Sequence, residues 1–112
     1  MPDDAFDIIM KIHVRAPFRL VRAAAPYMRL KGTSTRSLFL MCAQLECVGD
    51  AAKENRSIVN VSSTSGLHGN VGQANYAAAK AAVVGLTKTI AKEWGPFNVR
   101  ANTVAFGLVH TR

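Results

Sequence analysis

Apolar positions recur at helical spacing over the first 28 residues of the chain. The positions that share this spacing are Phe6, Ile9, Met10, His13, Val14, Pro17, Leu20, Val21 and Ala24. Because residues three and four apart lie on one side of a helix, the pattern predicts a helix over residues 1–28 with these positions on one face. Asp3 and Asp4 suit the positive end of such a helix. Pro17 should kink it or divide it, because proline has no amide hydrogen.

The second half of the chain alternates strand patterns with one long helical pattern. Residues 57–62 are β-branched, apolar and bounded by polar residues, which predicts a short buried central strand. A glycine-spaced loop is expected over 64–72, a second helix over 73–93, and another strand over 99–104. In an open parallel sheet the ligand crevice lies outside the carboxyl ends of the strands. Ser63 directly follows the first strand and is therefore expected in that crevice.

The segment between the first helix and the first strand fits neither pattern. Residues 30–49 form an atypical insertion, and residues 37–48 within it are strongly apolar. Such insertions are usually functional loops or poorly ordered segments. Two interpretations stay open, a hydrophobic segment that docks a lipid or partner and an inserted sequence with no selected structure. We expect this segment to be the least ordered part of the chain.

Composition narrows the functional classes only moderately. The chain has 112 residues, enough for one domain, and a formal net charge of +7. Its basic residues are dispersed and its aromatics few, so nucleic-acid binding is not expected.

Cys42 and Cys47 are close together and indicate reduced thiols of an intracellular protein, cytoplasmic or in the mitochondrial matrix. No apolar run reaches the length needed to span a membrane, and no metal site is predicted.

Three residues near the middle of the chain form a candidate catalytic unit. Tyr76 and Lys80 are four apart in an alanine-rich run that should be helical, so they share one helix face. An ammonium beside a phenol favours the phenolate, and the phenol can then exchange a proton with a substrate. Ser63, at the end of the preceding strand, can hydrogen-bond the same substrate oxygen. A surface tyrosine paired with a solvated lysine is the alternative for an isolated motif of this kind.

The flanking sequence carries a resemblance to a known family. The stretches Ile-Val-Asn-Val-Ser-Ser, Gly-Gln-Ala-Asn-Tyr-Ala-Ala-Ala-Lys and Val-Arg-Ala-Asn-Thr-Val-Ala-Phe-Gly resemble short-chain dehydrogenases/reductases. Within that family the likeness is to β-ketoacyl carrier-protein reductases and to hydroxysteroid or hydroxyacyl dehydrogenases. The resemblance covers residues 1–28 and about 56–112. It implies an α/β fold, a partial Rossmann-like doubly wound parallel sheet with helices in three α/β/α layers.

The resemblance also implies a role for each candidate residue. Tyr76 would be the general acid/base, Lys80 would assist it and bind the nicotinamide ribose, and Ser63 would orient the substrate oxygen. The further cofactor-binding positions implied are Gly107, Val109 and Thr111. The implied cofactor is NAD or NADP, with NADPH slightly favoured, and the implied substrate is a small carbonyl compound or secondary alcohol. A homo-oligomer is the expected assembly of a full-length form.

Two residues depart from the family pattern. Phe106 stands where the family usually has proline, and His13 stands where it usually has an asparagine that helps a proton-relay water. A histidine can shuttle protons, so His13 either takes over that task or is a partly buried polar residue without one.

The glycine-rich phosphate loop of the family, the first βαβ units and the last strand are expected to be absent from this chain. We therefore expect residues 1–112 to be a single incomplete domain of an NAD(P)-dependent oxidoreductase. The alternative is a truncated, non-catalytic isoform that acts as an interaction or dimerisation module.

Overall fold

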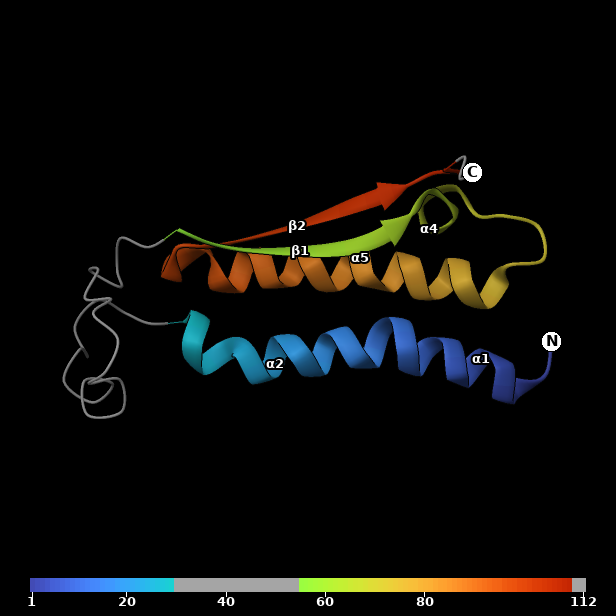
Figure 1. The fold of residues 1–112 in the computed structure, drawn as a ribbon, viewed down its shortest axis with the longest axis horizontal. Coiled ribbons are helices and arrows are strands. Elements are labelled where there is room, and N and C mark those ends of the chain that lie inside the picture. Colours follow the sequence, from blue (N-terminus) through green and yellow to red (C-terminus); the bar gives the residue numbers. More distant parts are fainter. Residues whose placement is uncertain (30–54, 110–112) are drawn as a thin grey trace.

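The computed structural model describes residues 1–29 and 55–109, and these form a parallel two-stranded sheet with helices packed along it (Figure 1). The expected insertion at 30–49 and the predicted cofactor residue Thr111 lie outside the described residues. The predicted α/β class with parallel strands is confirmed. Within the described ranges, no helix is both long and apolar enough to cross a membrane.

The first helical pattern folds into three consecutive segments. They are α1 (Asp3–Met10), the π-helix η1 (Lys11–Arg15) and α2 (Ala16–Met28). The amide of Ala16 bonds to the carbonyl of Lys11, five residues back, where an α-helix would reach back four. Pro17 lies in the first turn of α2, where its missing amide hydrogen is tolerated. Pro17 was predicted to kink or divide the helix; in the structure the helix continues past it, with the π-helical segment directly before α2.

The inward face of this helix differs from the predicted one at two positions. Phe6 and Leu20 were expected inside, but their exposed fractions are 41% and 72%. The partly buried positions instead include a series spaced by four residues, namely Ala5, Ile9, His13, Pro17, Val21 and Ala25. Phe6 and Leu20 fall outside this series and point to solvent.

The sheet consists of β1 (Arg56–Ser63) and β2 (Val99–Phe106), paired in parallel from Arg56 opposite Val99 to Ser63 opposite Phe106. Successive side chains of a strand point to opposite faces. In β1 the face of Ile58, Asn60 and Ser62 is covered, whereas Val59 and Val61 on the other face are 59% and 52% exposed. The expectation of a fully buried strand is therefore wrong for the described residues, because helices cover only one face of the sheet.

The core lies between that face of the sheet and the long helix α5 (Ala74–Trp94), which continues into a short 3-10 helix, η2 (Gly95–Phe97). Ile90, Trp94 and Val99 form its buried cluster, and side chains of α2 pack against that cluster. In Figure 1, α5 runs beneath both strands and the helix formed by α1, η1 and α2 runs alongside α5.

The connection between β1 and α5 is partly helical. Thr64–His68 form α4, where a glycine-spaced loop was predicted. The loop resumes after α4, and Gly69 and Gly72 in it have positive φ angles of 78° and 77°, a backbone conformation that glycine adopts without strain. The glycine pattern therefore predicted the second part of this connection and missed the helical turn in the first part.

Candidate active site

The carboxyl end of β1 places Ser63 at the start of α4. Ser63 has an extended backbone and caps the helix, with its Oγ accepting a hydrogen bond from the amide of Ser65 at 3.2 Å. Serine is favoured at such a cap because its oxygen satisfies an amide that has no partner within the helix. Ser63 was predicted to follow the strand directly; in the structure it is the last residue of β1 and the cap of α4.

Tyr76 and Lys80 lie on adjacent turns of α5, and the lysine side chain runs toward β1. Lys80 Nζ is 5.6 Å from the centroid of the Tyr76 ring, within the usual range of a cation–π contact. The same Nζ donates a hydrogen bond to the carbonyl oxygen of Val61 at 3.1 Å. Lys80 is only 8% exposed and Tyr76 is partly buried, so this lysine is not a solvated surface residue.

Two further contacts fix Lys80 against the end of β1. The hydroxyl of Ser62 donates to the carbonyl oxygen of Lys80 at 2.8 Å. Gly66 of α4 packs on the same turn of α5, and a Cβ added there would stand 2.7 Å from Lys80 Cβ. Ser62 and Gly66, which lie on either side of Ser63 in the sequence, contact Lys80 and so hold this part of the chain against α5. The Ser63 hydroxyl itself accepts a hydrogen bond from the Ser65 amide.

His13 reaches this group from the π-helical segment. Its ring meets the Tyr76 ring edge-on, with centroids 5.4 Å apart and ring planes at 89°. Burial lowers the pKa of His13 below the ordinary value of 6.5, and the positive charge of Lys80 lowers that pKa further. Both effects favour the uncharged imidazole. The sequence singled out His13 only through its departure from a family pattern and gave no sign of a ring contact with Tyr76.

The predicted cofactor residues follow β2 at the same end of the sheet. A Cβ added to Gly107 would be 3.7 Å from Thr64 Cγ2, so this glycine lies beside the start of α4. Val109 is 65% exposed. No cluster of three metal-ligating side chains occurs in the part of the chain that the structure describes.

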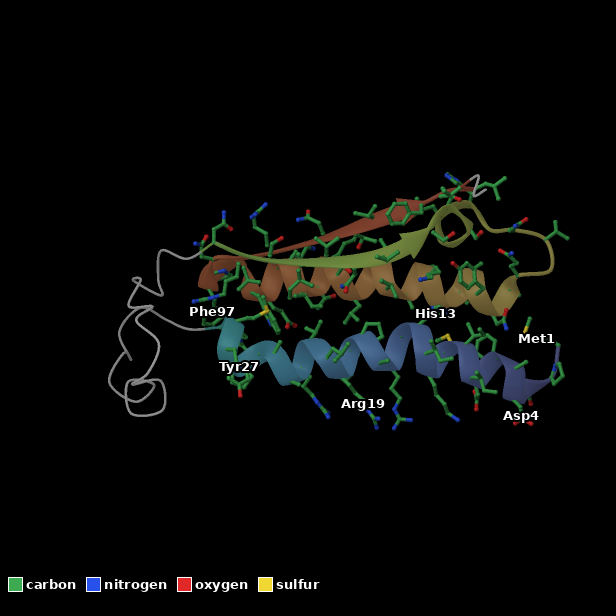
Figure 2. All side chains as sticks on the ribbon, in the orientation of Figure 1. Met1, Asp4, His13, Arg19, Tyr27 and Phe97 are labelled. Carbon is green, nitrogen blue, oxygen red and sulfur yellow. The ribbon has the colours of Figure 1, made fainter. Side chains whose placement is uncertain are left out.

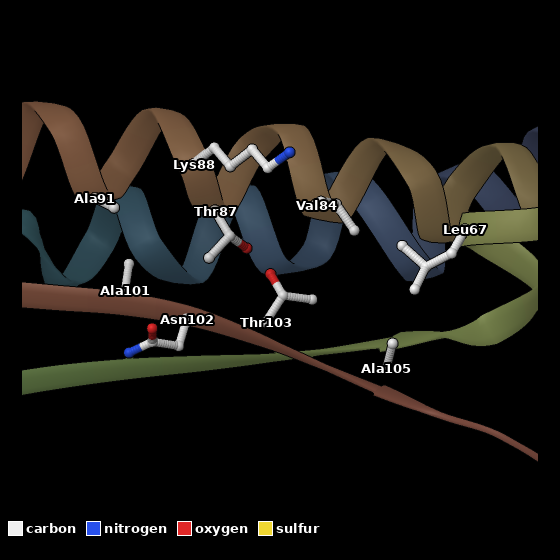
Figure 3. A pocket seen from close by; sticks show the side chains of 9 residues that line it. All are labelled: Leu67, Val84, Thr87, Lys88, Ala91, Ala101, Asn102, Thr103 and Ala105. Carbon is white, nitrogen blue, oxygen red and sulfur yellow. The ribbon is translucent and has the colours of Figure 1, made fainter.

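A separate hollow of about 330 Å³ lies between α5 and β2 (Figure 3). It is lined by side chains that include Val84, Thr87, Ala101 and Thr103. None of Ser63, Tyr76 and Lys80 lines it. The hollow therefore does not coincide with the candidate catalytic residues. The candidate site is identified by the contacts around Tyr76 and not by a cavity.

Comparison with known proteins shows the family to which this chain belongs. The profile of the short chain dehydrogenase family matches residues 1–112, the whole sequence. The chain belongs to the short chain dehydrogenase family. A 3-oxoacyl-(acyl-carrier-protein) reductase of Thermotoga maritima is 36% identical over 111 residues, which are 99% of this chain and 36% of the reductase. The human (3R)-3-hydroxyacyl-CoA dehydrogenase is 36% identical over 111 residues, which are 99% of this chain and 34% of that protein.

Solved structures of family members share the fold. A short chain dehydrogenase from Mycobacterium avium has a TM-score of 0.71 at 31% identity, with 96% of this chain and 31% of that chain covered. A 4-hydroxyisoleucine dehydrogenase complexed with NADH and succinate has a TM-score of 0.69 at 31% identity, with 96% and 40% covered. This chain spans about a third of the length of the Thermotoga maritima reductase and of the human dehydrogenase.

Proposed function

We propose that this chain carries the proton-transfer half of the active site of an NAD(P)-dependent oxidoreductase. The observation that supports it is the buried Lys80 ammonium 5.6 Å from the Tyr76 ring at the carboxyl end of a parallel strand. The chemistry that fits is the interconversion of a carbonyl compound and a secondary alcohol. Relatives named as 3-oxoacyl reductases and 3-hydroxyacyl-CoA dehydrogenases suggest a 3-oxoacyl or 3-hydroxyacyl thioester as the substrate class.

Tyr76 would move the proton in this reaction. In the reductive direction its phenol gives a proton to the carbonyl oxygen of the substrate, and in the oxidative direction the phenolate takes the proton of the alcohol. Lys80, whose Nζ is 5.6 Å from the centroid of the Tyr76 ring, would assist Tyr76. Ser63 would donate a hydrogen bond to the same substrate oxygen, and its cap on α4 holds its position at the end of β1.

The residues present fit the nicotinamide end of a dinucleotide. An ammonium has three N–H donors, and the Val61 carbonyl takes one from Lys80, so the others can reach ribose hydroxyls. Gly107 and Val109 follow β2 at the same end of the sheet, and Thr111, outside the described residues, stays a predicted cofactor-binding position. A bound nicotinamide supplies or accepts the hydride. Relatives solved with NADH and with NAD⁺ support a nicotinamide cofactor, and the preference for NADPH stays a prediction.

The test is a hybrid in which residues 1–112 replace the matching 111 residues of the Thermotoga maritima reductase. We expect the hybrid to reduce a 3-oxoacyl thioester with NADPH or NADH. Tyr76→Phe keeps the ring but has no transferable proton, so turnover should fall by ~10²–10⁴-fold while substrate binding survives. Tyr27→Phe is the matched control, because Tyr27 is 67% exposed on α2. A folded hybrid whose Tyr76→Phe variant retains full turnover would overturn the proposal.

The hybrid and the 112-residue chain together separate the catalytic proposal from the truncated, non-catalytic alternative. The sequence contains no Thr-Gly-x-x-x-Gly-x-Gly loop, and dinucleotide affinity depends largely on the pyrophosphate at a helix N-terminus. We expect calorimetry at micromolar protein to detect no NADPH or NADH binding by this chain. An active hybrid combined with a silent isolated chain would mean that the site is competent and that cofactor affinity comes from other parts of a longer protein.

A further inference from the structure

His13 lies in the middle of η1, the one π-helical segment in the described part of the chain. The π-helix η1 occupies Lys11–Arg15, between α1 and α2. Short π-helical segments of this kind occur frequently at functional sites. Figure 2 places His13 on the side of this helix that faces α5. The local backbone irregularity and the candidate active site therefore meet at one residue.

The contact that His13 makes is with the ring of Tyr76. The edge-to-face arrangement, at 5.4 Å and 89°, is a favoured geometry for two aromatic rings. The second cationic or aromatic contact of the same ring is Lys80 Nζ, 5.6 Å from its centroid. A phenol contacted by an imidazole from η1 and by an ammonium from its own helix has less freedom to rotate than a tyrosine with one contact.

The charged groups around His13 favour its neutral form. Of the elements around η1, α5 packs across it, and the titratable groups of α5 that face His13 are Tyr76 and Lys80. On η1 itself Lys11 and Arg15 are exposed cations. Burial and the positive charge of Lys80 both disfavour a protonated His13, so the neutral ring is the form that packs on Tyr76.

We propose that His13 is a positioning residue that holds the Tyr76 phenol in its orientation through edge-to-face ring contact. The catalytic consequence rests on the proposed function, whereas the contact itself does not. Loss of the ring should lower turnover by misplacing the phenol and should leave substrate binding largely unchanged. A displacement of about 1 Å can cost 10²-fold in rate, so the effect on kcat should lie between about 10-fold and 100-fold.

The kinetic test uses three variants of the hybrid enzyme. His13→Ala removes the ring, and kcat should fall while KM stays near its parent value. His13→Phe restores an aromatic edge without nitrogen atoms and should recover most of the lost kcat. His13→Asn keeps a polar group but has no ring, so it should resemble His13→Ala. Full activity of His13→Asn together with a poor His13→Phe would overturn the proposal and assign a hydrogen-bonding role to this position.

A spectroscopic test on the 112-residue chain does not depend on catalysis. The ring protons of His13 should show a ring-current shift in the NMR spectrum that disappears in Tyr76→Leu and persists in the control Tyr27→Leu. In Lys80→Met the pKa of His13 should rise toward its ordinary value, because one of the two causes of its lowering is removed. Absence of the ring-current shift from the parent chain would contradict the contact even if the hybrid were active. An inactive hybrid with the ring-current effect intact would contradict only the proposed function.

Discussion

At the scale of single residues, the contact of Gly66 with α5 shows how closely the two helices approach at the candidate site. The backbone of α4 lies so near Lys80 that a Cβ on Gly66 would be 2.7 Å from Lys80 Cβ and 2.8 Å from the Lys80 carbonyl carbon. Contacts this short with backbone atoms cannot be relieved by a side-chain rotation. Glycine is therefore required here for packing and not for its backbone angles.

Gly66→Ala should destabilise the chain by about 1–3 kcal/mol, the usual cost of inserting a methyl group into a packed site. Gly85→Ala is the matched control, because Gly85 lies within α5 and an added Cβ there meets no atom within 4 Å. Alanine is the better helix former, so the control should be stabilised by roughly 0.5–1 kcal/mol. Urea denaturation measures both changes. Equal effects of the two substitutions would contradict the close approach of α4 and α5.

His13 should also give the chain a dependence of stability on pH. Its pKa is lowered in the folded state, first by burial and then by Lys80, so the unfolded chain binds a proton more readily. Above pH 6.5 both states are neutral at this residue and nothing changes. As the pH falls below 6.5, the unfolded state gains protons first and the free energy of unfolding decreases. His13→Gln should lose less stability between pH 7.5 and 5.5 than the parent chain in urea titrations, and an identical loss would contradict the lowered pKa.

At the scale of elements, a short hydrogen-bond chain ties the middle of β1 to α5. Asn60 Nδ2 donates to Thr87 Oγ1 at 2.8 Å, and Thr87 Oγ1 donates to the Val83 carbonyl oxygen at 2.8 Å. Thr87 is 2% exposed, so its hydroxyl has little access to water. This bond sets the position of the strand along the helix and, with it, the position of Ser63 relative to Tyr76.

Thr87→Val keeps the shape of the side chain but leaves the Asn60 amide without its partner. The cost should be about 1–3 kcal/mol, because removing one partner exposes the desolvation penalty of the other. Thr89→Val is the matched control: the Thr89 hydroxyl bonds to the Gly85 carbonyl oxygen in the same way, but on the exposed side of α5. Thermal or urea unfolding should show a clear loss for the first variant and little change for the second. Comparable losses would mean that the bond to Asn60 contributes nothing.

The elements that the sequence predicted well are those with strong local patterns. The alanine-rich run around Tyr76 and the β-branched run before Ser63 favour a helix and a strand without help from distant residues. The five-residue helix α4 and the π-helical segment were not predicted, because both depend on packing against α5 that no local pattern encodes. For the same reason, the motif spacing predicted the Tyr76–Lys80 pair, whereas the contact between His13 and Tyr76 joins residues 63 positions apart and had no local signal.

At the scale of the whole molecule, the sheet presents an apolar face that the described helices leave uncovered. Val59, Val61 and Phe106 are more than half exposed on it, and Val104 is 40% exposed. Paired parallel strands are normally covered on both faces, so a chain with one open face is expected to associate. The apolar, β-branched pattern of the strand did not indicate an uncovered face, because a strand that is covered on both faces has the same kind of composition.

We predict that the 112-residue chain self-associates in a concentration-dependent way through this face. Val59→Thr keeps the β-branched shape but makes the face more polar, and it should shift sedimentation velocity profiles toward the monomer. Val21→Thr, on the helix face that packs on the core, would instead destabilise the fold and serves to separate loss of association from loss of structure. A parent chain that is monomeric up to high micromolar concentration would contradict the prediction.

The π-helical segment has a consequence for the phase of the whole first helix. Inward positions recur every four residues from Ala5 to Ala25, but four residues of an α-helix turn by about 400°, so such a stripe drifts by about 40° at each step. The wider winding of η1 turns less per residue and so counters part of this drift halfway along. One helix can thus keep a single side against α5, from Asn75 near its start to Trp94 at its end. Removing one residue from Lys11–Arg15 would restore uniform winding and at the same time swing half of the helix away from its partner.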